Sequence, residues 1–173
     1  PIEKLAKKLK VECFRGSETN VLKRFYEAIK KFGKNYNIIV RANADCPIFM
    51  PTILDRDIKR FVKNKFDVYS PFHKNIMPFG FSFVIFEKNT VFKIFKKAKL
   101  LKHKEHIENY CFDNDNKFKI LLSPMNELYN APKIKITLDT KNDFLKIKKI
   151  FNMIKNVKIS NQPSLLINLF KKN

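Results

Sequence analysis

Glycine, cysteine and tryptophan are scarce: the 173 residues include three glycines, three cysteines and no tryptophan. Because the only glycines are Gly16, Gly33 and Gly80, the chain lacks a glycine-rich loop of the kind that cradles phosphates. The cysteines are scattered and show no Cys-x-x-Cys spacing, which argues against a zinc motif and a disulfide framework. Reduced thiols of this kind are typical of a cytoplasmic protein, and we expect that location.

Long apolar runs are also lacking. The longest, Met77–Phe86, is interrupted by proline, glycine and serine and is far shorter than the ~20 residues of a membrane-spanning helix. We therefore expect no membrane span. The chain begins with Pro1 rather than methionine, so the lack of a visible leader carries little weight. Neither a Gly-x-Ser-x-Gly elbow nor a Cys/His pair can be argued from spacing, so nucleophilic catalysis has no support.

Arginine is rare in a strongly basic chain. Lysine and arginine total 36 against 16 acidic residues, giving a net charge of +20. A basic surface can bind nucleic acid, but here the lysines are spread over the whole length. We interpret them as solvated faces and expect no specific nucleic-acid partner. A mildly positive cleft for phosphates remains compatible with this composition.

Hydrophobic residues make up 45% of the chain, enough for the core of a single domain over residues 1–173. Predicted helices and strands alternate along most of it, which favours an α/β fold with a mostly parallel sheet flanked by helices. The predicted helices are Ile2–Lys10, Ser17–Phe32, Pro51–Lys63, Thr90–Leu101, Lys104–Phe112, 140–154 and Pro163–Phe170. The predicted strands are Val11–Phe14, Tyr36–Val40, Phe66–Ser70, Met77–Phe86, Lys117–Leu122 and Lys133–Leu138.

Two aspartates follow predicted strands. Asp45 comes after Tyr36–Val40, and Asp139 comes after the last predicted strand. Ligands of open α/β sheets lie outside the carboxyl ends of the strands, so these two carboxylates could converge on one Mg²⁺. The alternative is that Asp45 only caps the turn before the helix predicted at Pro51, since Asp and Pro are ordinary turn residues, and that Asp139 only caps the helix that follows it. Thr140-x-x-Asp143 resembles a capping box at the start of that helix.

Arg15, Gly16 and Ser17 combine a turn, exposed amides and a fixed cation at a predicted helix start, which suits an anion or the polar edge of a nucleotide. A plain helix cap at Ser17 is the alternative. His103 and His106 have a spacing that can hold a metal, but no third ligand follows, and we interpret them as a surface pair.

Several stretches together carry a resemblance to a known family. They are Val-Glu-Cys-Phe-Arg-Gly-Ser-Glu at 11–18, Asn-Val-Leu-x-Arg-Phe-Tyr at 20–26, Arg-Ala-Asn-Ala-Asp-Cys-Pro at 41–47, Glu-His at 105–106, Phe-Lys-Ile at 118–120 and Leu-Asp-Thr at 138–140 with Asp143. In order and spacing the chain resembles the cytidylyltransferase-like family of spore coat polysaccharide biosynthesis. That family is related to the synthetases that make CMP-Kdo and CMP-sialic acid.

The resemblance implies a Rossmann-like nucleotide-diphospho-sugar transferase fold. It also implies the transfer of CMP from CTP to a sugar acid or related sugar, with Mg²⁺ and release of pyrophosphate. Asp45 and Asp139 match the acidic positions that hold the metal. Arg15, Gly16 and Ser17 match positions that approach the nucleotide, and we assign Arg41 to the same nucleotide-binding group.

Two departures from the family qualify this implication. The first strands and the Gly/Arg/Lys-rich loop that wraps the triphosphate have no counterpart, so the fold is expected to be N-terminally incomplete and this chain alone inactive. The family's Pro-Arg-Gly-x-Asp-Val-Glu stretch reads Pro-Phe-Gly-Phe-Ser-Phe-Val at 78–84. The alternative function is a non-catalytic, degenerate relative that serves as a binding or partner subunit. Pairing as a homodimer is left open.

Overall fold

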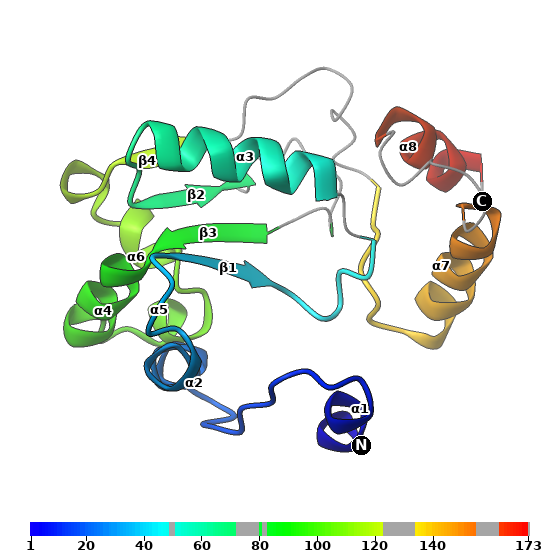
Figure 1. Cartoon of the computed structure of the whole chain (residues 1–173). Coiled ribbons are helices and arrows are strands. Elements are labelled where there is room, and N and C mark those ends of the chain that lie inside the picture. Colours follow the sequence, from blue (N-terminus) through cyan, green and yellow to red (C-terminus); the bar gives the residue numbers. More distant parts are fainter. Residues whose placement is uncertain (49–50, 72–79, 81–82, 123–133, 155–162, 173) are drawn as a thin grey trace. The chain divides into compact units, whose positions relative to one another are not determined.

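The structure is a computed structural model of the whole chain, which describes residues 1–48, 51–71, 80, 83–122, 134–154 and 163–172 (Figure 1). The chain forms two compact units. The first unit comprises Pro1–Ile39 and Glu87–Asp115, and the second comprises Val40–Phe86 and Asn116–Asn173.

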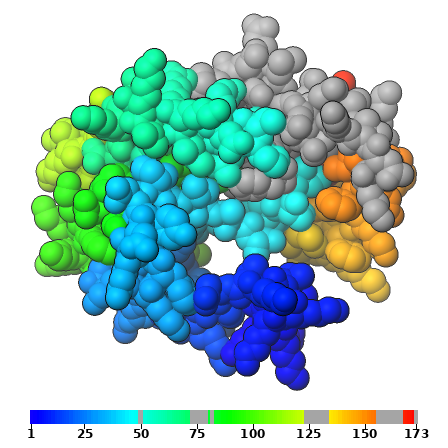
Figure 2. Space-filling model, in the orientation of Figure 1, coloured from blue at the N-terminus to red at the C-terminus, as the bar shows by residue number. Residues whose placement is uncertain are grey.

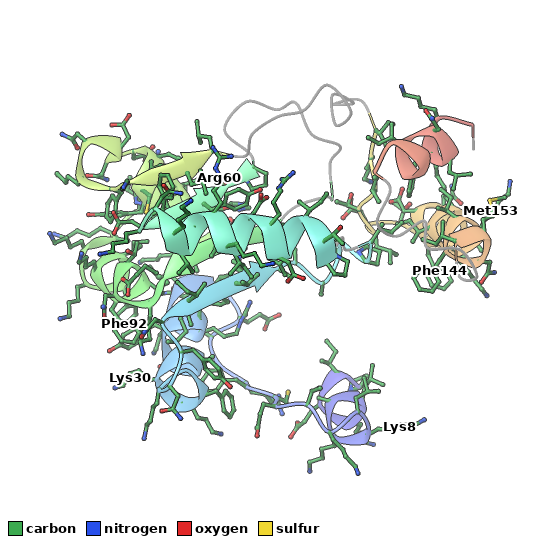
Figure 3. The ribbon with its side chains drawn as sticks, turned by 45° about the horizontal axis from the view of Figure 1, so that its top comes forward. Lys8, Lys30, Arg60, Phe92, Phe144 and Met153 are labelled. Carbon is green, nitrogen blue, oxygen red and sulfur yellow. The ribbon has the colours of Figure 1, made fainter. Side chains whose placement is uncertain are left out.

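The first unit is helical. It contains α1 (Ile2–Lys8), α2 (Val21–Phe32), α4 (Lys88–Lys97), α5 (Leu101–Glu105) and α6 (Asn109–Phe112). Helix α2 packs against α4 and α5 (Figure 1), and the ring of Tyr26 on α2 stacks on Phe95 of α4 with centroids 4.0 Å apart. Phe92 (labelled in Figure 3) lies one turn earlier on α4. Its ring meets that of Tyr26 edge-on, with the ring centroids 5.1 Å apart.

The start of α2 differs from the prediction. We expected Ser17 to cap it, but the helix begins at Val21, and Asn20 is the N-cap, with its Oδ1 accepting the N–H of Lys23 at 2.9 Å. Ser17 instead stabilises the turn before the helix, because its Oγ accepts the N–H of Asn20 at 3.0 Å. The strand predicted at Val11–Phe14 is wrong, because those residues adopt no regular structure.

His103 also differs from the prediction. We interpreted it as half of a surface pair, but it is only 4% exposed, and its Nε2 lies 2.7 Å from Oδ2 of Asp113. The side chain of His106 is 52% exposed. The pair therefore does not act as a unit. The sequence spacing could not show this, because α5 ends at Glu105 and a turn separates it from α6.

Four strands form one sheet in the order β1-β3-β2-β4. Their bounds are β1 Ile38–Ala42, β2 Val68–Ser70, β3 Phe83–Glu87 and β4 Ile120–Leu122. Strand β2 pairs in parallel with β4 and antiparallel with β3, with Val68 opposite both Ile120 and Phe86. The α/β class is confirmed, and the sheet is mixed because β3 runs opposite to β1, β2 and β4 (Figure 1). Because β3 directly follows β2 along the chain, it can return beside it without the crossover that a parallel partner needs.

The helices of the second unit are α3 (Pro51–Lys63), α7 (Lys141–Ile154) and α8 (Pro163–Lys172). Helix α3 has the predicted bounds, and α7 and α8 lie close to theirs. A cluster of apolar side chains, termed here the isoleucine core, joins α7 and α8 to the segments that precede α3 and α7. Its buried members are Ile48, Ile136, Ile147, Ile150, Ile154, Ile167 and Phe170.

Outside this core, α7 keeps apolar side chains on its surface. Phe144 and Met153 are 48% and 45% exposed and project from the helix (Figure 3). No helix in the described part of the chain is long and apolar enough to cross a membrane.

Candidate functional site

The structure brings the segments that carry Asp45 and Asp139 together. The backbone N–H of Leu138 donates a hydrogen bond of 2.8 Å to the carbonyl oxygen of Asp45. Both aspartates are exposed. Figure 2 shows the cyan atoms of the chain that follows β1 beside the yellow atoms of the segment that leads into α7. Two acids 94 residues apart in sequence therefore stand on neighbouring, hydrogen-bonded stretches of backbone.

The isoleucine core anchors the two segments that carry Asp45 and Asp139. Ile48 lies three residues after Asp45, and Ile136 lies three residues before Asp139; both are buried in this core. The backbone of Gly80 lies close to the second segment. It has φ +111°, and a Cβ placed there would lie 2.8 Å from the carbonyl carbon of Ile136. Only glycine permits this backbone conformation and this close approach without strain.

Each acid leaves one carboxylate oxygen open. Oδ1 of Asp45 lies 3.7 Å from the thiol of Cys46, a weak donor, and Oδ2 of Asp139 accepts the hydroxyl of Thr137 at 2.8 Å. Within the described part of the chain, Oδ2 of Asp45 and Oδ1 of Asp139 accept no hydrogen bond. Hard oxygen donors of this kind are the ligands that Mg²⁺ prefers.

Lys135 places a cation beside Asp139. Its Nζ lies 2.8 Å from Oδ2 of Asp139 and 3.1 Å from Oδ2 of Asp143. The hydrogen bond from Lys135 is the main reason that the pKa of Asp139 lies below its usual value, with the Thr137 hydroxyl second. The same two carboxylates raise the pKa of Lys135, so the side chain is firmly protonated at neutral pH.

Asp143 is the capping residue of α7. Its Oδ2 accepts the backbone N–H of Thr140 at 2.9 Å, and its own N–H donates to Oγ1 of Thr140 at 3.2 Å. This reciprocal pair is the capping box that the sequence predicts. The hydroxyl of Thr140, followed by Lys135, lowers the pKa of Asp143 from 3.8 to about 2.

Arg15, Gly16 and Ser17 lie in the first unit, in an irregular loop between α1 and α2. The side chain of Arg15 is 83% exposed and forms a long ion pair of 3.5 Å with Glu3. Arg24 on α2 holds the loop, since its Nη1 donates to the carbonyl oxygen of Ser17 at 2.7 Å. Among the described residues, nothing accepts a hydrogen bond from the backbone N–H of Gly16 or Ser17, so these amides can serve a ligand.

The predicted site residues thus fall into two groups. Asp45, Asp139 and the half-buried Arg41 of β1 belong to the second unit, whereas Arg15, Gly16 and Ser17 belong to the first. Sequence reasoning missed Lys135 and Arg24 as parts of these groups. Alternation was the available signal for Lys135: in an extended segment residues 135, 137 and 139 point to the same side. No comparable signal identified Arg24, because its contact depends on how the loop folds back over α2.

In the described part of the chain, no three or more His, Cys, Asp or Glu side chains are grouped to hold a metal ion. A metal at Asp45 and Asp139 would take two protein carboxylates and fill its shell with water or phosphate oxygens. That is the usual arrangement for Mg²⁺ in nucleotide-binding sites. The two carboxylates therefore fit Mg²⁺, a hard cation that prefers oxygen ligands.

Comparisons with known proteins agree with one another. A sequence profile of the cytidylyltransferase family matches residues 2–168. The chain is 35% identical over 156 residues to the uncharacterized protein MJ1063 of Methanocaldococcus jannaschii, covering 88% of this chain and 62% of that protein. It is 27% identical over 140 residues to the spore coat polysaccharide biosynthesis protein SpsF of Bacillus subtilis, covering 80% of this chain and 56% of SpsF.

A solved structure extends the likeness to three dimensions. The structure of a cytidylyltransferase from Leptospira borgpetersenii matches 99% of this chain and 71% of its own, with a TM-score of 0.86 and 29% sequence identity. The chain spans about three fifths of the length of the two curated relatives.

Proposed function

The chain belongs to the cytidylyltransferase family, and we propose that it is part of an Mg²⁺-dependent enzyme that transfers CMP from CTP to a sugar acid or related sugar. The product would serve surface polysaccharide or glycan biosynthesis, the process named for the SpsF relative. The observation that supports the proposal most directly is the backbone hydrogen bond between Leu138 and Asp45, because it joins the two segments that carry the acids assigned to the metal by the family resemblance.

In this proposal Asp45 and Asp139 are the residues that would hold Mg²⁺, and each has a carboxylate oxygen that no described residue bonds. When bound, the metal would neutralise charge that develops on the phosphates and would fix their position. The residues around it keep the acids in place. Lys135 and Thr137 hold Oδ2 of Asp139, and the backbone bond to Leu138 ties Asp45 to the same surface.

The reaction is a nucleotidyl transfer. A hydroxyl of the sugar attacks the α-phosphorus of CTP, the bond from that phosphorus to the oxygen bridging the β-phosphorus breaks, and pyrophosphate leaves. The proton of the hydroxyl passes to solvent or to a nearby carboxylate. Such transfers depend mainly on positioning and charge neutralisation, which ordered carboxylates and cations provide.

Arg15, Gly16, Ser17 and Arg41 are proposed to bind the nucleotide. Support comes from the exposed guanidinium of Arg15 and from the two loop amides that no described residue uses. Arg24 would act as a positioning residue, because its bond to the carbonyl of Ser17 orders this loop before a ligand arrives.

The second candidate function is a non-catalytic relative that binds a partner or a nucleotide sugar. It is favoured by residues 78–84, where the arginine, aspartate and glutamate of the family stretch are replaced by uncharged residues. Phe83 and Val84 are 5% and 2% exposed, so their side chains serve the core rather than a sugar.

The experiment that separates these functions is pyrophosphate release by the complete gene product that carries this chain, with Mg²⁺, CTP and a panel of acidic and amino sugars. The enzyme proposal predicts release that Asp45→Asn and Asp139→Asn abolish. CTP or CMP-sugar binding without any release would instead support the non-catalytic relative. Release that survives both substitutions would overturn the proposed metal site.

A further inference from the structure

Lys135 has a place in the site that the family resemblance does not assign. Its ammonium bridges Asp139 and Asp143 at 2.8 and 3.1 Å, and its side chain is 46% exposed. An ammonium group has three N–H donors, and two are used by these carboxylates. Within the described part of the chain the third has no acceptor, so it can bind an incoming anion.

We infer that Lys135 couples metal binding to nucleotide binding at this site: it opposes a lone divalent cation and then binds the phosphates of the metal–nucleotide complex. The inference rests on the proposed function, since it assumes that Asp139 is a metal ligand. Lys135 is a positioning and charge-setting residue here, and no step of bond breaking is assigned to it.

The first half of the inference follows from charge. A cation held on one oxygen of Asp139 reduces the negative potential at the other oxygen, to which a metal would bind. At a separation of roughly 5 Å, a unit charge opposes a divalent ion by an amount worth about tenfold in affinity, even in a water-like dielectric. Free metal should therefore bind weakly to the wild-type chain.

The second half follows from the charges that a nucleotide brings. A triphosphate carries several negative charges, so the repulsion between Lys135 and the metal is offset when the two ligands arrive together. The free N–H of Lys135 then has a phosphate oxygen to bind, and charge-assisted hydrogen bonds of this kind are among the strong ones. Lys135 should thus weaken metal binding alone and strengthen the binding of the metal–nucleotide pair.

The test is a pair of affinities measured on the full chain and on Lys135→Met. Mn²⁺, used as the probe for the metal alone and followed by the electron paramagnetic resonance signal of the free ion, should bind about tenfold more tightly to Lys135→Met. CTP in saturating Mg²⁺, measured by calorimetry, should bind about tenfold more weakly to the same variant. Lys135→Arg keeps the charge and should restore both affinities to near the wild-type values.

Lys149→Met is the matched control, because Lys149 is an exposed lysine of α7 whose removal changes the net charge equally. Its affinities for Mn²⁺ and for CTP should stay within about twofold of the wild-type values. If Lys135 only kept Asp139 in place, both affinities of Lys135→Met would fall together, and the inference would be overturned. Unchanged affinities would overturn it as well.

The failure of this inference and that of the proposed function can be told apart. If wild-type binding of Mg²⁺ and CTP does not depend on Asp45 and Asp139, the metal site itself is wrong. If that dependence holds while Lys135→Met lacks the opposite shifts, only the role of Lys135 is wrong.

Discussion

The second unit carries aspartates in two contrasting settings. Asp57 on α3 is completely buried, and both its oxygens are bonded, one to Nε of Arg56 at 2.8 Å and the other to the hydroxyl of Tyr69 on β2 at 2.7 Å. Asp45 and Asp139 are exposed, and each keeps an open oxygen in the described part of the chain. The enclosed acid joins a helix to the sheet, whereas the exposed acids are free to bind a ligand.

This difference separates stability from function. A buried carboxylate with a full set of partners contributes through the bonds that its removal would leave unmade. An exposed carboxylate contributes little to stability, because water can replace its partners. Substitutions in the two settings should therefore produce opposite patterns of lost stability and lost binding.

The largest loss of stability is expected for Asp57→Ala. The hydroxyl of Tyr69 would lose its carboxylate acceptor in a buried position, and a cavity would form beneath α3. We expect the free energy of unfolding to fall by about 3 kcal/mol. Urea denaturation measures this change, with Asp55→Ala on the exposed side of α3 as the control. If Asp57→Ala kept normal stability but failed to bind metal, the distinction between the buried, structural acid and the exposed, binding acids would be wrong.

Gly80→Ala should lower both the stability of the chain and its binding of CTP. A methyl group there would meet the backbone of Ile136 at 2.8 Å, and an alanine would be strained at φ +111°. We expect a loss of about 2 kcal/mol in stability, together with weaker Mg²⁺-dependent CTP binding, because Ile136 lies in the segment that carries Asp139. Denaturation and calorimetry on the same preparation test this. Unchanged binding would mean that the segment tolerates the shift.

A smaller loss of stability should appear at low pH, where Asp143 becomes protonated. Asp143 has a pKa of about 2 in the folded chain against 3.8 normally, so its capping bonds stabilise the folded state fully above pH 3.8. This contribution is lost as the pH falls through about 2. Between pH 4 and 2 the wild type should therefore lose more stability than Asp143→Asn, which cannot titrate at this position. Parallel curves for the two proteins would contradict this assignment.

Much of the fold could be predicted because periodicity and capping are local. Helix α3 begins at its proline and ends where predicted, and the capping box of α7 was visible as Thr140-x-x-Asp143. The errors came from long-range structure. Val11–Phe14 has the β-branched and aromatic character of a strand, but no strand in the described part of the chain pairs with it. The sheet is mixed because β3 returns beside β2, which a pattern of alternating elements does not indicate.

The candidate site shows the same limit. The acids were proposed from their places after predicted strands, and the backbone bond from Leu138 to Asp45 shows that the segments carrying them are neighbours. The strand expected at Lys133–Leu138 is reduced to a single bridge residue, Lys135, in its described part from residue 134 onwards. The ion pairs of Lys135 depend on the turn into α7, so the sequence could suggest its side of the segment but not its partners.

The central claim is that Asp45 and Asp139 form a metal–nucleotide site. The most direct test is calorimetry of CTP binding to this chain with and without Mg²⁺, compared with Asp45→Asn and Asp139→Asn. Our account predicts that binding requires Mg²⁺ and weakens at least tenfold in either variant, while urea denaturation shows little change in stability. CTP binding that is indifferent to Mg²⁺ and to both substitutions would contradict it.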